Sequence, residues 1–145
     1  MSRLKRFMMR APIGLYRVGL GGLLGKRFLL LEHTGRKSGL PRKTVLEVVE
    51  IDDRRSPIIV SGYGERSDWC RNVTADPEVF FTTGRRRVGA TAIRLDRQQA
   101  LAVFDRYRRE HPRAAAAIGN RIGVSLVDDP ESAAAQLPLF RLETS

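Results

Sequence analysis

The chain has little of the residue types that most often hold a metal ion or a covalent cross-link. Among its 145 residues are one cysteine, Cys70, and two histidines, His33 and His111, which lie far apart in the sequence. A single cysteine excludes an intramolecular disulfide, and these residues have no spacing typical of a zinc site. We therefore predict a metal-free protein of the cytoplasm.

Long apolar runs are also missing. A membrane-spanning helix needs roughly 20 apolar residues, but residues 18–25 are flanked by Arg17, Lys26 and Arg27 and are followed by no signal-peptide cleavage pattern. Residues 1–27 instead mix basic and apolar positions. We predict a basic amphipathic helical segment there that covers one end of the fold, with peripheral contact to a membrane surface as the alternative.

Acidic residues are scarce in the first third of the chain. Residues 1–43 hold 11 Lys or Arg and one acid, Glu32, whereas residues 44–145 hold 15 of each sign. The whole net charge of +10 therefore lies in the first 43 residues. Such a concentration fits a pocket for a polyanionic small molecule, a nucleic-acid surface or a membrane surface.

Six segments have the β-branched or alternating composition of strands. They are residues 28–32, 43–51, 57–61, 78–83, 87–95 and 137–142. Since closing a sheet removes its exposed edges, we predict an α+β fold over residues 28–145: a split β-barrel with about six antiparallel strands and peripheral helices.

Two helices are predicted between these strands. The first, at residues 68–75, has Ser67 as its N-cap and ends before Asp76-Pro77, because a residue that precedes proline avoids the helical region. The second follows Asp96, and Gln99 lies where it completes a capping box. An Ala-rich segment and a turn at residues 128–130 then lead to the last strand.

The densest group of cations lies at residues 35–44, Gly-Arg-Lys-Ser-Gly-Leu-Pro-Arg-Lys-Thr. Two glycines let the backbone turn its N–H groups toward an anion, and the hydroxyls of Ser38 and Thr44 add donors. Arg36 and Arg42 can hold phosphate or carboxylate oxygens bidentately. The loop thus suits phosphate binding, although a generic basic turn has the same composition.

The order of residues in this loop resembles the Gly-Arg-Lys/Arg-Ser-Gly-x-Pro-Arg signature of the deazaflavin-dependent nitroreductase family. The resemblance continues at residues 60–64, Val-Ser-Gly-Tyr-Gly, and at residues 68–77, which are similar to the family's Trp-Tyr-x-Asn-Leu-x-Ala-x-Pro helix. Two departures stand out. Cys70 occupies the place of the motif's tyrosine, and residues 62–67 differ from the family's Gly-Gly and Pro-containing version.

The resemblance implies a pyridoxamine-phosphate-oxidase-like barrel that binds coenzyme F420, an 8-hydroxy-5-deazaflavin with a lactyl-phosphate and oligoglutamate tail. It implies an oxidoreductase that passes hydride to an activated unsaturated organic substrate: a nitro compound, a quinone or an enone. FMN is the alternative coenzyme. A non-catalytic module for a coenzyme, a nucleic acid or a membrane is the alternative class. Nucleic acid is not expected, since the loop lacks interleaved aromatic residues, and a homodimer is a further option by analogy with other split barrels.

Carried over position by position, the resemblance assigns the phosphate and tail to the loop and the ring system to residues 61–63, flanked by residues 69–72. The candidate cofactor-binding residues are Arg36, Lys37, Ser38, Gly39, Arg42, Lys43, Thr44, Val45, Ser61, Gly62, Tyr63, Trp69, Cys70 and Asn72. Tyr63 is the candidate proton donor, although simple packing beside two glycines explains it equally well. No other residue is assigned a catalytic role.

Overall fold

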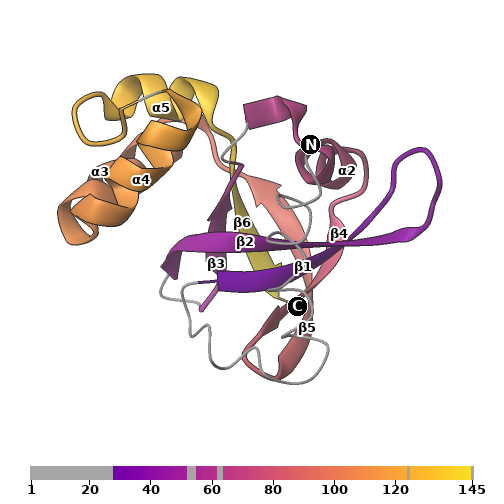
Figure 1. The fold of residues 1–145 in the computed structure, drawn as a ribbon. Coiled ribbons are helices and arrows are strands. Elements are labelled where there is room, and N and C mark those ends of the chain that lie inside the picture. The colour runs from indigo at the N-terminus through magenta and orange to yellow at the C-terminus, as the bar shows by residue number, and fades with distance from the viewer. Residues whose placement is uncertain (1–27, 52–54, 62–63, 124, 145) are drawn as a thin grey trace, which may run out of the picture.

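The computed structural model describes residues 28–51, 55–61, 64–123 and 125–144. Within them, six antiparallel strands close into a barrel in the order β1, β2, β3, β6, β5, β4 (Figure 1). The strands are β1 (Phe28–Thr34), β2 (Pro41–Ile51), β3 (Pro57–Val60), β4 (Glu78–Thr83), β5 (Arg86–Arg94) and β6 (Leu139–Thr144). The predicted barrel is confirmed. The predicted N-terminal helical segment, residues 1–27, lies outside the described residues.

The longest strand, β2, contributes side chains to two hydrophobic cores, one inside the barrel and one under the helices. It pairs with β1 along most of its length and with β3 at its end, and the register shifts between Val48 and Glu50. Since successive side chains of a strand point to opposite faces, Val48 packs inside the barrel and Val49 packs under the helices. The bulge leaves Val49 without a register partner on β3. β2 also starts earlier than predicted, because its pairing with β1 continues to Pro41. Pro41 and Arg42 therefore also belong to the strand.

Three helices form a layer on one side of the barrel: α3 (Arg97–Glu110), α4 (Pro112–Ile122) and α5 (Pro130–Gln136) (Figure 1). α3 begins with the predicted capping box, since Asp96 accepts from the Gln99 N–H at 2.8 Å and Gln99 accepts from the Asp96 N–H at 2.9 Å. Its apolar face buries Phe104 completely. α4 and α5 were not predicted, although each has proline in its first turn.

α2 (Asp68–Ala75) covers one end of the barrel, next to a short 3₁₀ turn, η2 (Gly64–Arg66). It ends where predicted, and its buried face places Trp69 edge-to-face on Phe140, with ring centroids 5.6 Å apart. The prediction that the Ser67 side chain caps α2 is wrong. Its hydroxyl instead donates to the Gly64 carbonyl at 3.1 Å.

Candidate functional site

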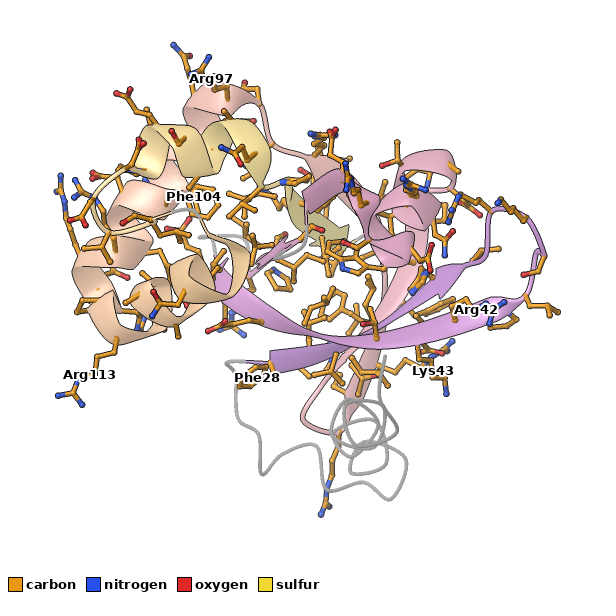
Figure 2. The ribbon with its side chains drawn as sticks, turned by 45° about the horizontal axis from the view of Figure 1, so that its top comes forward. Phe28, Arg42, Lys43, Arg97, Phe104 and Arg113 are labelled. Atoms are coloured by element: carbon orange, nitrogen blue, oxygen red, sulfur yellow. The ribbon has the colours of Figure 1, made fainter. Side chains whose placement is uncertain are left out.

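The hairpin formed by β1 and β2 carries most of the predicted site residues. It projects beyond the barrel on the side away from the helical layer; Figure 2 shows Arg42 and Lys43 on this arm and Arg113 of α4 on the opposite side of the molecule. Residues 36–43 are all exposed. The projection presents these residues to solvent, although the Arg36 side chain itself is only 24% exposed.

The tip of the hairpin is held by its own hydrogen bonds. The Gly35 N–H donates to the Leu40 carbonyl at 2.9 Å, and the Gly39 N–H donates to the Gly35 carbonyl at 2.8 Å. These two N–H groups are therefore used within the turn, and the prediction that the loop backbone turns its N–H groups toward an anion stays a prediction. The glycines are needed for the turn: a Cβ at Gly35 would lie 2.6 Å from the Ser38 Oγ, and Gly39 has a φ of +70°, where side chains are strained.

Arg36 is fixed against α2. The Asn72 Oδ1 accepts from the Arg36 backbone N–H at 3.1 Å and from its Nη1 at 2.9 Å, and the Asp68 Oδ1 lies 3.5 Å from its Nη2. Two predicted site residues, Arg36 and Asn72, are thus brought together. The Arg36 side chain is 24% exposed. A guanidinium has five N–H donors, and these two side-chain contacts leave three for a ligand.

The other cations of the hairpin differ from Arg36. In the described ranges, no carboxylate forms an ion pair with Lys37, Arg42 or Lys43. Glu32 lies opposite Lys43 in the β1–β2 register, but it accepts two hydrogen bonds from Arg87 instead. Exposed cations without an acidic partner attract anions, and a phosphate or several carboxylates would complement them.

His33 lies buried at the base of the hairpin, with 6% of its surface exposed. Its Nδ1 is 3.0 Å from the Asn72 Nδ2. Burial, and then the positive charge of Arg42, lower the pKa of His33 to about 4 against a smaller opposing effect of Asp68. The imidazole is therefore neutral at physiological pH. No sequence motif singled it out, although it shares the inward face of β1 with Leu31.

The residues predicted near the ring system lie at the α2 end of the barrel. Ser61, Trp69 and Cys70 are buried, and the Ser61 hydroxyl donates to the Gly64 carbonyl at 2.5 Å. Burial raises the pKa of the Cys70 thiol, so this group is protonated and unreactive at neutral pH. Thr44 and Val45 are half-buried in β2. Gly62 and Tyr63, the candidate proton donor, lie outside the described residues.

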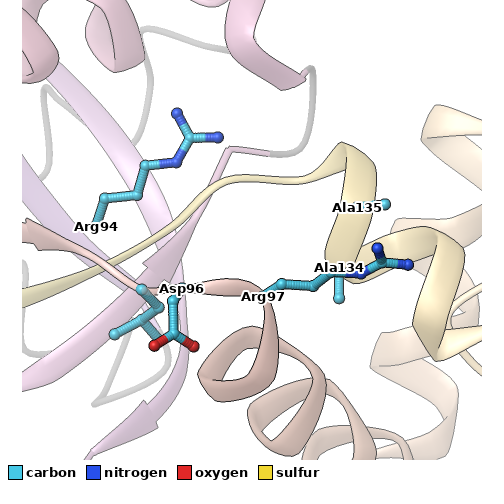
Figure 3. A pocket seen from close by; sticks show the side chains of 6 residues that line it. Arg94, Asp96, Arg97, Ala134 and Ala135 are labelled. Atoms are coloured by element: carbon cyan, nitrogen blue, oxygen red, sulfur yellow. The ribbon is translucent and has the colours of Figure 1, made fainter.

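A hollow of about 550 Å³ lies away from all of these residues, where β5, α3 and α5 meet (Figure 3). It is lined by Arg94, Leu95, Asp96, Arg97, Ala134 and Ala135. Two of its charged groups are already engaged, because Arg94 pairs with Glu65 at 2.5 Å and Asp96 caps α3. The hairpin remains the better candidate for an anionic ligand.

Residues 6–127 match the family model described as F420H(2)-dependent quinone reductase. The chain belongs to this family. A protein of Mycobacterium tuberculosis (strain ATCC 25618 / H37Rv), described as an F420H(2)-dependent quinone reductase, is 34% identical over 92 residues, which are 59% of this chain and 61% of that protein. The chain thus matches less than two thirds of that relative's length. The match confirms the resemblance to deazaflavin-dependent reductases, and the family's description agrees with the expected coenzyme and with oxidoreductase activity.

Solved structures support the fold. One described as an F420-H2 dependent reductase (FDR-A) has a TM-score of 0.57 at 21% identity, covering 81% of this chain and 95% of its own. A protein of unknown function from Agrobacterium tumefaciens str. C58 has a TM-score of 0.62 at 19% identity, covering 93% of this chain and 55% of its own. Identities this low establish the shared barrel and nothing more.

Proposed function

We propose that this chain is an oxidoreductase that uses reduced coenzyme F420 to transfer hydride to a quinone or to another activated unsaturated compound, such as a nitro compound or an enone. The observation that carries the proposal is the exposed set of cations on the β1–β2 hairpin: Arg36, Lys37, Arg42 and Lys43. The coenzyme has a phosphate and several carboxylates on one tail. Four cations within eight residues match such a polyanion in charge.

The residues of the hairpin fit the anionic end of the coenzyme. Lys37, Arg42 and Lys43 have no acidic partner in the described ranges, and Arg36 keeps three donors. The Ser38 Oγ accepts from the Leu40 N–H at 3.2 Å, which leaves its own O–H to donate. These groups would hold the tail and fix the direction in which the ring system extends.

The proposal keeps the ring system at the α2 end of the barrel, near Ser61, Gly62, Tyr63, Trp69, Cys70 and Asn72. The bound coenzyme would supply hydride from its C5 carbon. Because Trp69 and Cys70 are buried, they would support the wall of the site from behind rather than stack on the ring. Tyr63 would donate the proton that the reduced substrate requires.

Calorimetric titration tests the proposal. We expect coenzyme F420 to bind with micromolar or better affinity and FMN to bind more weakly, because FMN has no oligoglutamate tail for the hairpin cations. Mixing the protein with reduced F420 and a soluble quinone should then oxidise the coenzyme, which its absorbance reports. Tight binding of FMN without binding of F420 would contradict the coenzyme assignment. Binding of F420 without turnover would contradict the activity.

We propose further that the protein acts in the cytoplasm and that residues 1–27 bring it to the membrane surface, where apolar quinones partition. The charge of +10 in the first 43 residues supports this. In the described part of the chain, no helix is long and apolar enough to span a bilayer. Co-sedimentation should be stronger with vesicles of anionic lipid than with zwitterionic vesicles, and loss of residues 1–27 should abolish the difference.

A homodimer through the outer face of β4 and β5 is the last part of the proposal. Phe80 and Ile93 are 43% and 38% exposed there, and a groove of about 230 Å³ borders Phe80. An exposed aromatic side chain beside a groove favours association. Light scattering on the eluted protein should give twice the monomer mass, and Phe80→Asp should give the monomer. A monomeric wild-type protein would contradict this part.

A further inference from the structure

Asn72 has a hydrogen-bond partner on each side of its carboxamide. Two donors of Arg36, the backbone N–H and Nη1, converge on one atom of this group, at 3.1 and 2.9 Å. Only the oxygen of a carboxamide can accept from two donors, so Oδ1 faces Arg36 and Nδ2 faces His33. This fixes the direction of the amide.

The direction of the amide in turn fixes the state of His33. The Asn72 Nδ2 is a donor, and it lies 3.0 Å from the His33 Nδ1. That ring nitrogen must therefore hold a lone pair, which places the proton of the neutral imidazole on Nε2. The chain of contacts is His33 to Asn72 to Arg36, and it joins β1, α2 and the hairpin tip.

The link between His33 and Asn72 is made away from water. His33 is 6% exposed and Asn72 is 4% exposed. A buried amide N–H that lost its acceptor would have no water to replace it, and the amide would turn or shift instead. Either change would remove the oxygen from Arg36. The acceptor at His33 therefore affects the position of the Arg36 guanidinium, although the two groups are not in contact.

We infer that His33 is a positioning residue for Arg36: by accepting from Asn72, it fixes the carboxamide that holds the backbone and the guanidinium of Arg36 before any ligand arrives. The inference rests on the proposed function in one respect, namely that Arg36 binds the anionic tail of the coenzyme. An arginine held in this way loses less conformational freedom on binding and offers its remaining donors in a fixed direction. Lys37, in contrast, has no acidic partner in the described ranges and must be ordered by the ligand itself.

The charges around His33 are consistent with this state. Arg42 approaches from β2 and Asp68 from α2, and burial together with Arg42 outweighs Asp68. A proton on Nδ1 would set two donors against each other, since the Asn72 Nδ2 faces the same atom. In the neutral form with its proton on Nε2, the His33 Nδ1 can accept from the Asn72 Nδ2.

Two variants of His33 distinguish the effect of its hydrogen-bond acceptor from the effect of its side-chain volume. His33→Asn places a carbonyl oxygen near the position of Nδ1, whereas His33→Leu keeps a similar volume without an acceptor. Hydrogen exchange of the Arg36 backbone N–H, measured by NMR without coenzyme, should be roughly tenfold faster or more in His33→Leu and within about threefold of wild type in His33→Asn. Nitrogen shifts of wild-type His33 should show the proton on Nε2.

The same variants are then titrated with coenzyme F420. His33→Leu should bind roughly tenfold more weakly than wild type, and His33→Asn should recover most of the loss. Unchanged exchange of the Arg36 N–H in His33→Leu, or a proton on Nδ1 in the wild type, would overturn the inference. A wild type that binds no F420 would refute the proposed function alone, because the exchange measurement needs no ligand.

A second variant covers the case in which His33→Leu does not fold. Asn72→Asp keeps an oxygen for Arg36 but replaces the donor that faces His33 with an acceptor. His33 should then gain a proton on Nδ1, so that its pKa rises, while the Arg36 N–H stays protected from exchange. A His33 pKa unchanged by this substitution would overturn the inference.

Discussion

The charged residues on the two sides of the barrel are arranged differently. On the helical side, Arg106 of α3 forms two hydrogen bonds to Glu50 of β2, at 2.6 and 3.0 Å. On the hairpin side, Lys37, Arg42 and Lys43 have no acidic partner within the described ranges. The same kind of side chain ties elements together in one region and stays available for a ligand in the other. Net charge alone therefore does not locate a site, whereas the pairing of the charges does.

The largest expected effect is a loss of stability caused by a substitution on the helical side. Phe104 of α3 is fully buried among the residues that join the helices to β2 and β3, so Phe104→Ala should lower the free energy of unfolding by about 3–5 kcal/mol. Urea titration measures the loss. Coenzyme affinity of the folded fraction should not change, because α3 is remote from the hairpin. A loss below about 1 kcal/mol would contradict the assigned packing.

The next effect appears at the base of the hairpin on lowering the pH. The pKa of His33 is lowered from 6.5 to about 4, so the unfolded chain binds a proton in this window that the folded chain does not. The free energy of unfolding should therefore decrease as pH falls from about 6.5 to 4, by about 3 kcal/mol from this group. Denaturant titrations at pH 7 and pH 4 measure it.

His33→Asn serves as the control for that measurement, since it lacks the titrating ring while the carboxylates remain. The difference between the two proteins isolates the histidine. Equal pH dependence of wild type and His33→Asn would show that His33 is not kept neutral by the fold.

Part of the fold and of the site could be predicted from the sequence. The strands were predictable because β-branched and alternating residues mark them, and the start of α3 was predictable because the partners Asp96 and Gln99 are only three residues apart. The contact of His33 with Asn72 spans 39 residues. No local pattern reports a contact at that distance, so the sequence placed Asn72 near the coenzyme without indicating that it holds Arg36.

A smaller effect is expected on coenzyme affinity, and it should differ between the two sides of the barrel. Arg42→Ala should weaken F420 binding on the order of tenfold, because it removes an exposed cation that has charge-assisted hydrogen bonds to offer. Arg113→Ala is the matched control: it removes the same charge from an exposed position in α4, on the opposite side of the molecule (Figure 2). Calorimetry compares them. Equal losses would mean that only total charge matters.

The smallest effect concerns the paired charges. Arg106 and Glu50 are 51% and 22% exposed, and ion pairs open to solvent contribute about 1 kcal/mol or less. Arg106→Gln should therefore lower the free energy of unfolding by less than about 1 kcal/mol and leave F420 affinity unchanged. Urea titration and calorimetry on the same sample check both. A change in affinity would mean that the helical side takes part in binding.

Some hydrogen bonds could not be predicted, because a sequence does not show which of several partners a donor will choose. Ser67 precedes a helix and has the composition of an N-cap, but its hydroxyl bonds to the nearby Gly64 carbonyl. The loop backbone was predicted to turn N–H groups toward an anion, but those of Gly35 and Gly39 are used to close the turn. In both cases an acceptor within a few residues was nearer than the expected partner. Lys37, Arg42 and Lys43, which have no acidic partner in the described ranges, were predictable from composition.

The most direct test of the central claim maps the coenzyme onto the backbone by NMR. Amide shifts recorded before and after saturation with F420 should change most at residues 36–45 and in α2, and should stay constant in α4. Shifts confined to the hollow lined by Arg94, Arg97 and Ala134, or no shifts at saturating coenzyme, would contradict the claim that the hairpin cations hold the anionic tail.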